Sequence, residues 1–114
     1  MAKISFDFDS TLDQLVIQEL AKLFIKEGHE VWVVSSRMDR IQWNRDLYRV
    51  ASSLGIPRNR IYLTEGSFKY NYLQKEKFDL HFDDNYMEIK AARENFCTCI
   101  FIPVYDPDEI IEQI

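Results

Sequence analysis

Short apolar runs and helical stripes alternate along the 114 residues of the chain. Near-continuous apolar runs are typical of strands buried on both faces, whereas apolar positions repeated every three or four residues predict helices. The runs predict five strands, over residues 3–8, 30–35, 60–64, 78–82 and 98–104. The stripes predict helices over residues 14–27, 45–54, 67–74 and 86–95, and a last short helix that starts near Asp106.

Strands that alternate with helices predict an α/β fold of the three-layer α/β/α, Rossmann-like type, with a parallel five-stranded sheet. The length predicts a single domain over residues 1–114. Asp13 is placed to cap the helix over 14–27, and Gly28 is placed to end it. Asp106, followed by Pro107 and Glu109, resembles the capped start of the last helix.

Composition and charge disfavour several classes of protein. No apolar stretch approaches the ~18 residues of a membrane span, and the first residues lack the layout of a signal peptide, so we expect a cytoplasmic location. A net charge of −5 disfavours general binding to nucleic acid. Cys97 and Cys99 lack further Cys or His neighbours, so we expect packed free thiols rather than a zinc site or a disulfide.

Residues with useful chemistry follow three of the predicted strands: Asp7 to Thr11, Ser35 to Arg37, and Asp83 to Asn85. The carboxyl ends of parallel strands line the ligand crevice of an open sheet, so these groups should converge. Carboxylates at the end of a buried strand need a partner, and oxygen ligands suit Mg²⁺. The pattern predicts a magnesium site for a phosphoryl group, with Arg37 and Lys69 as sources of positive charge.

Four segments, "FDFDST", "VWVVSSR", "KYNYLQ" and "LHFDDN", occur in this order at predicted strand or helix edges. They resemble the four motifs of the haloacid dehalogenase-like (HAD) phosphohydrolases. Those motifs are Asp-x-Asp-x-Thr after the first strand, a hydrophobic strand ending in Thr or Ser, a lysine, and a late acidic pair. The resemblance implies a HAD-like fold and a Mg²⁺-dependent phosphomonoesterase that works through an aspartyl-phosphate intermediate.

Carried onto this sequence, the resemblance implies that Asp7 is the nucleophile and that Asp9 is the general acid and base. Chemistry agrees with that division, because one carboxylate must attack while the other must be free to trade a proton. Ser35 would bind a phosphoryl oxygen, and Lys69 would pair with Asp7 and the transferring group. Mg²⁺ would be held by three groups: Asp7, the Asp9 backbone carbonyl, and one acid of the Asp83–Asp84 pair, with Asp84 preferred.

Several of these residue roles have more than one candidate. Ser36 competes with Ser35, and Lys75 and Lys77 compete with Lys69. Thr11, counted with Ser36 and Arg37 on the substrate side, is expected mainly to brace the loop after the first strand. His81 alternates along its strand in the manner of a packed core histidine.

The segments between the motifs leave no room for a cap domain, so we expect an open crevice. Capless relatives act on bulky phosphates or are covered by a second subunit. In "SSRMDRIQWNRDLYR", arginines alternate with Trp43 and Tyr48, which suits a nucleotide or a nucleic-acid end. The alternative is an amphipathic helix with a solvated basic face, whose charge Asp39 and Asp46 partly offset.

Two other function classes stay open. Response-regulator receivers also combine a parallel sheet, an acidic metal cluster, Ser/Thr and Lys. Their acidic pair follows the first strand, however, and their acceptor aspartate follows the third, which ends here at Thr64. A binding or regulatory protein that keeps the fold without turnover is the remaining alternative, although the complete set of acids disfavours it.

Overall fold

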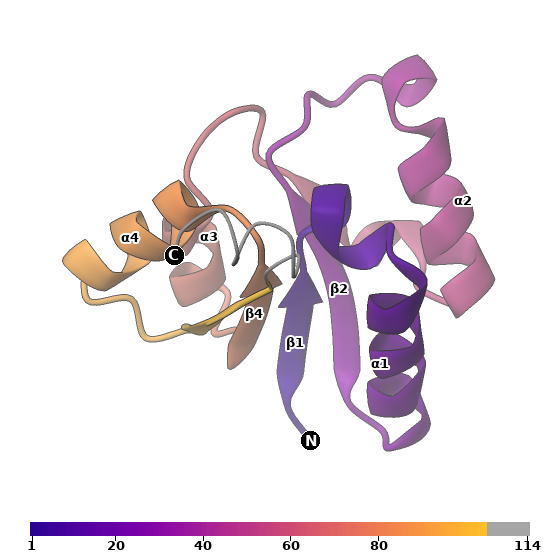
Figure 1. The fold of residues 1–114 in the computed structure, drawn as a ribbon, viewed down its shortest axis with the longest axis horizontal. Coiled ribbons are helices and arrows are strands. Elements are labelled where there is room, and N and C mark those ends of the chain that lie inside the picture. The colour runs from indigo at the N-terminus through magenta and orange to yellow at the C-terminus, as the bar shows by residue number, and fades with distance from the viewer. Residues whose placement is uncertain (105–114) are drawn as a thin grey trace, which may run out of the picture.

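The computed structural model describes residues 1–104, so the predicted helix from Asp106 lies outside the described residues. All five strands pair in parallel, in the order β3-β2-β1-β4-β5 (Figure 1). The first strand along the chain is therefore central. The strands are β1 (Lys3–Phe6), β2 (Glu30–Ser35), β3 (Ile61–Leu63), β4 (Leu80–Asp83) and β5 (Ile100–Pro103).

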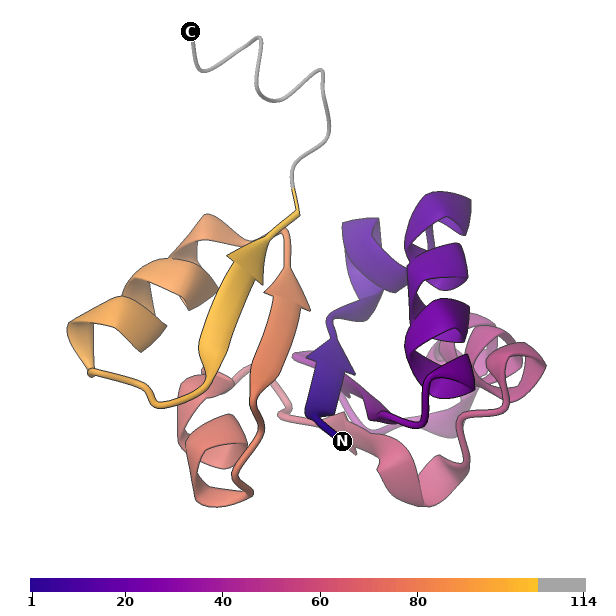
Figure 2. The ribbon, with the colours of Figure 1, turned by 90° about the horizontal axis from the view of Figure 1, so that it is seen from below.

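Two helices cover each face of the sheet (Figure 2), which confirms the predicted three-layer α/β fold. The helices are α1 (Leu15–Lys26), α2 (Arg45–Leu54), α3 (Tyr70–Lys75) and α4 (Tyr86–Glu94). Short turns, η1 (Phe8–Leu12), η2 (Ile41–Trp43) and η3 (Arg58–Arg60), complete the connections. Residues 1–104 contain no cap domain. Within this same range no helix has the length and apolar character needed to cross a membrane.

Each face of the sheet has its own apolar core. Under α1 and α2, Phe6 and Phe82 stack with ring centroids 4.8 Å apart, and Phe24 packs against both. Full burial of one such side chain stabilises the fold by ~1.5–3 kcal/mol. Under α3 and α4 lie Val34 and Phe101, among other apolar residues. The sheet is therefore fixed from both sides, and its carboxyl edge is a rigid place for a site.

The predicted start and end of α1 differ in outcome. The N-cap role of Asp13 is wrong: the N-cap of α1 is Gln14, which makes no side-chain capping bond, and Asp13 instead ends the turn η1. Gly28 follows α1 with φ of +88°, a left-handed conformation that favours glycine, so its predicted role is confirmed.

The first strand is shorter than predicted because the chain coils directly after Asp7. Backbone bonds run from the Leu12 N–H to the Asp7 carbonyl and from the Asp13 N–H to the Phe8 carbonyl, both at 3.1 Å. Apolar periodicity could not show this turn, since Phe8 and Leu12 are buried inside it as strand residues would be. The coil turns Asp7 and Asp9 into different surroundings.

Candidate active site

A pocket of about 190 Å³ opens at the carboxyl ends of β1 and β4. Every residue that lines it is polar or charged, and the lining residues come from four separate stretches of chain: Asp7, Asp9, Ser10, Ser36, Lys69, Asp84 and Asn85. The predicted convergence of strand ends therefore occurs. Five of the nine site residues that the sequence singled out line this pocket: Asp7, Asp9, Ser36, Lys69 and Asp84.

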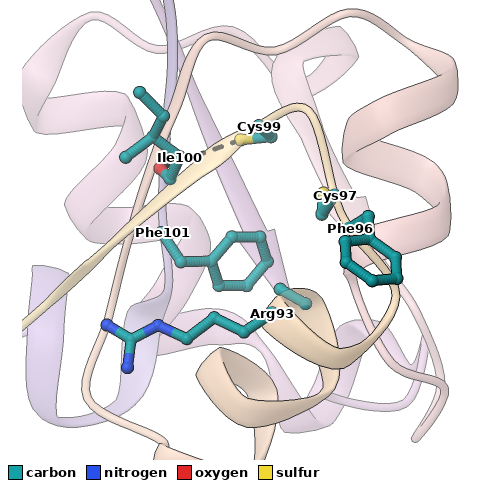
Figure 3. Close-up of a pocket in the computed structure, with 7 residues that line it drawn as sticks. Arg93, Phe96, Cys97, Cys99, Ile100 and Phe101 are labelled. Carbon is teal, nitrogen blue, oxygen red and sulfur yellow. Dashed lines mark hydrogen bonds between the residues drawn. The ribbon is translucent and has the colours of Figure 1, made fainter.

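A larger pocket, about 310 Å³, lies beside the edge strand β5 (Figure 3). Aromatic rings and two thiols line it, and Arg93 is its one charged residue. Both cysteines are free, as predicted, and burial raises the pKa of Cys99 to about 12, so its thiol stays protonated near neutral pH. We therefore place the chemistry in the smaller, acidic pocket.

Lys69 lies at the centre of the acidic pocket. It directly precedes α3 and is 1% exposed. Its Nζ donates to Asp7 Oδ1 at 2.8 Å and to Asp83 Oδ2 at 2.7 Å. Lys75 and Lys77 are exposed, so Lys69 alone of the three candidate lysines meets Asp7.

Glu88 is a member of this cluster that sequence reasoning missed. Its Oε1 accepts the Lys69 backbone N–H at 3.1 Å, and its Oε2 lies 4.0 Å from the Lys69 Nζ. A signal was available in the sequence, because Glu88 precedes Ala91 and Ala92 by three and four residues and so shares the buried face of α4.

With every group ionised, the cluster would hold more negative than positive charge. Burial raises the pKa of Asp7 to about 8, and the nearby Asp83 adds to that rise, although Lys69 opposes it. Burial would lower the pKa of Lys69, but Asp7 and Asp83 outweigh burial and raise it. For Asp83, hydrogen bonding from His81 and the charge of Lys69 outweigh burial, so its pKa is lowered. One ammonium therefore cannot balance all the carboxylates in their ionised forms, and either a proton on Asp7 or a further cation could offset the excess.

The two neighbouring acids of "FDDN" have different surroundings. Both oxygens of Asp83 are engaged: Oδ2 by Lys69 and His81, each at 2.7 Å, and Oδ1 by the Asn85 N–H at 2.9 Å. Asp84 is half-buried on the pocket wall, and Thr11 Oγ1 lies 3.5 Å from its Oδ1. Asp83 is thus occupied by protein groups, whereas Asp84 can offer its oxygens to a ligand.

The donor set suits a hard divalent cation. Carboxylate oxygens of Asp7, Asp83 and Asp84 lie within 4.8 Å of one another. Mg²⁺ is usually held by one or two carboxylates together with waters and phosphate oxygens. Asp7 and Asp84 meet that requirement, and the preference for Asp84 over Asp83 is supported by the bonds that already occupy Asp83.

Asp9 lies outside this carboxylate cluster. Its side chain is 57% exposed, and Arg37 binds both its oxygens, with Nη2 to Oδ1 at 2.7 Å and Nε to Oδ2 at 3.0 Å. Arg37 also donates to both oxygens of Asp46 and to the Trp43 carbonyl. All five guanidinium N–H groups are therefore engaged, and Arg37 holds Asp9 rather than facing the pocket as an open phosphate ligand.

The two serines after β2 take different positions. Ser35 is buried, and its Oγ accepts the Arg37 N–H at 3.2 Å. Ser36 is exposed and lines the pocket. Thr11 is fully buried beside Asp84, in keeping with a bracing role. The structure therefore brings Ser36 to the pocket and leaves Ser35 beneath it.

Comparison with protein-family models gave no match, and comparison with curated proteins gave none either. The resemblance of the four segments to a family stays a prediction that rests on their order and their placement.

Proposed function

We propose that the protein is a Mg²⁺-dependent phosphomonoesterase of HAD-like type that works through an aspartyl-phosphate on Asp7. The observation that carries this proposal is the environment of Asp7. Its carboxylate accepts a hydrogen bond from the buried Lys69 and lies within 4.8 Å of the Asp83 and Asp84 oxygens at a strand end. A nucleophilic carboxylate needs positive charge beside it to attack an anionic phosphate, and Lys69 together with a bound Mg²⁺ would supply that charge.

The reaction would proceed in two balanced steps. First, an Asp7 oxygen forms a bond to phosphorus while the bond to the leaving oxygen breaks, and Asp9 gives that oxygen a proton. Second, Asp9 takes a proton from water, whose oxygen attacks phosphorus and releases Asp7 and inorganic phosphate. Lys69 would steady the phosphoryl oxygens throughout. Mg²⁺ held by Asp7 and Asp84 supplies charge neutralisation when bound.

Asp9 can act only after it leaves Arg37. Both of its oxygens accept hydrogen bonds from the Arg37 guanidinium, so neither faces the position of the leaving oxygen. Because Asp9 and Asp46 share one guanidinium, Asp46 can keep Arg37 in place while Asp9 turns towards the leaving oxygen.

The surroundings of the pocket support a substrate larger than the phosphate alone. The loop after β2 exposes Met38, Ile41 and Trp43, the last at 62%, and its cations Arg40 and Arg45 are also exposed. Aromatic and cationic side chains exposed in one segment suit a nucleotide or the terminal phosphate of a nucleic acid. A second copy of the chain is the other candidate to cover the open pocket. The proposal includes a cytoplasmic location, where free thiols persist.

The test is an assay of purified protein with an aryl phosphate and Mg²⁺, followed by a panel of nucleotides, phosphorylated oligonucleotides, sugar phosphates and phosphopeptides. We expect turnover that Asp7→Asn lowers by a factor of about 10³ or more, while circular dichroism shows an intact fold. Undiminished activity in Asp7→Asn would overturn the proposal.

One observation favours a second function, a phospho-accepting regulatory domain. If Asp9 stayed on Arg37, it could not activate water, and an aspartyl-phosphate on Asp7 would persist. The lifetime of the phosphorylated protein after addition of a small phosphodonor separates the two. A phosphatase discharges within its turnover time, whereas a signalling domain keeps the phosphate for much longer.

A further inference from the structure

Behind the acidic pocket runs a chain of hydrogen bonds that the proposed reaction does not use. Ser5 and His81 are partners in the β1–β4 register, and neither is exposed. Ser5 Oγ lies 2.7 Å from His81 Nδ1, and His81 Nε2 lies 2.7 Å from Asp83 Oδ2. Asp83 and Lys69 then continue the chain to Asp7.

For a neutral His81 ring, one arrangement of protons satisfies every member of this chain. Asp83 faces the Lys69 ammonium and is ionised, so it can only accept. His81 Nε2 must therefore carry the hydrogen, and Nδ1 must accept from the Ser5 hydroxyl. Burial lowers the pKa of His81, which agrees with a neutral ring. The donors run in one direction, from Ser5 to His81 to Asp83.

The ring of His81 is also held by packing. Phe101 lies edge-on to it, with ring centroids 4.9 Å apart. His81 thus has one orientation, and its Nε2–H has one target. That target is the same Asp83 oxygen that accepts from Lys69.

We propose that His81 is a positioning residue for the phosphatase site, which holds the Asp83 carboxylate on Lys69 so that Lys69 faces Asp7 and Asp84 is left to the metal. This inference rests on the proposed function. Without the Nε2–H donor, Oδ2 of Asp83 accepts a hydrogen bond from Lys69 alone. The Asp83 carboxylate can then turn towards the bound Mg²⁺, and Lys69 is no longer aligned with Asp7. His81 itself touches neither the metal nor the substrate.

Two substitutions at position 81 separate positioning from packing. In His81→Gln the amide can still donate to Asp83, whereas in His81→Phe the ring volume stays and the donor is lost. His29→Gln is the matched control, because His29 is the other histidine and accepts the Ala2 N–H at the opposite end of the sheet. The readouts are kcat and KM for an aryl phosphate and the Mg²⁺ concentration for half-maximal activity.

We expect His81→Phe to lower kcat by about 10- to 100-fold and to raise the half-saturating Mg²⁺ concentration, with little change in KM. His81→Gln should recover most of the loss, and His29→Gln should behave as wild type. Equal losses in His81→Gln and His81→Phe, or full kcat in His81→Phe, would overturn the positioning role.

A second measurement needs neither turnover nor a substituted residue 81. In a long-range ¹H–¹⁵N spectrum of ¹⁵N-labelled wild-type protein, we expect His81 as the neutral Nε2–H tautomer. The Nδ1–H tautomer would overturn the inference, because Nε2 would then carry no hydrogen for Asp83, whereas any state that protonates Nε2 keeps the donor. A wild-type protein without phosphatase activity would instead overturn the proposed function, so the two failures are distinguishable.

Discussion

The floor and the rim of one pocket solve the same electrostatic problem in different ways. We define the floor as the buried group at and beneath the pocket, Asp7, Lys69, His81 and Asp83, whose side chains are at most 9% exposed. We define the rim as the group at and beside the pocket edge, Asp9, Arg37 and Asp46. In each region two aspartates share one cation. On the floor the side chains are withdrawn from water, whereas the rim aspartates are more than half exposed.

The choice of cation follows this difference. A compact ammonium with three donors fits the crowded floor, where it meets Asp7 directly after β1, Asp83 of β4 and, at 4.0 Å, Glu88 of α4. A planar guanidinium suits the rim, because its fork can bind two carboxylates side by side. The floor can therefore hold its side chains in a fixed geometry. On the rim, Arg37 can release one aspartate and keep its hydrogen bonds to the other.

The largest expected effect tests the floor. Lys69→Met should lower the free energy of unfolding by about 3–5 kcal/mol, because removal of one partner leaves buried carboxylates without compensation. Urea denaturation of the metal-free protein measures it. Lys75→Met is the control at an exposed lysine and should stay within about 0.5 kcal/mol of wild type. A loss below 1 kcal/mol in Lys69→Met would show that the floor is less desolvated than its geometry indicates.

The next effect tests the rim through catalysis. Asp9→Asn should lower kcat by about 10²- to 10⁴-fold, the usual contribution of a general acid and base, with little change in stability. Steady-state kinetics and thermal melts give the two values. Asp39→Asn, at a nearby exposed acid, is the control. If Asp9→Asn turns over as fast as wild type, Asp9 is only the partner of Arg37.

Metal binding is expected to stabilise the floor by less than Lys69 does. Mg²⁺ at about 100 times its Kd should raise the free energy of unfolding by about 2.7 kcal/mol. Thermal melts with Mg²⁺ and with a chelator measure it. Asp84→Asn should remove most of this gain, because Asp84 is the acid whose oxygens remain available to a ligand. A full Mg²⁺ response in Asp84→Asn would assign the metal to other groups.

The smallest expected effect is a loss of stability on the rim. Arg37→Met should lower the free energy of unfolding by less than about 1 kcal/mol, because its partners are largely exposed to water and salt. The loss should shrink further in 0.5 M salt, whereas the loss in Lys69→Met should not. Melts of both variants at low and high salt check this contrast. Equal salt sensitivity would remove the distinction between floor and rim.

Individual elements show which features of the structure could be predicted from the sequence. The apolar run of residues 30–35 predicted β2 without error, and the stripe over 45–54 predicted α2, because strand and helix periods are local properties. The polar residues at strand ends were found for the same reason. The N-cap role of Asp13 failed because the coil after Asp7 is closed by backbone bonds, which leave no mark on the apolar pattern.

The sequence by itself determined the sheet, its helical layers and the edge where Asp7, Lys69 and the late acidic pair meet. Only the tertiary structure decided how those groups divide their contacts. It placed Ser36 rather than Ser35 on the pocket, gave Asp83 to Lys69 and His81, and gave Asp9 to Arg37. The physical reason is that periodicity records which face a residue occupies, whereas hydrogen-bond partners depend on distances of a few ångströms between segments far apart in the chain.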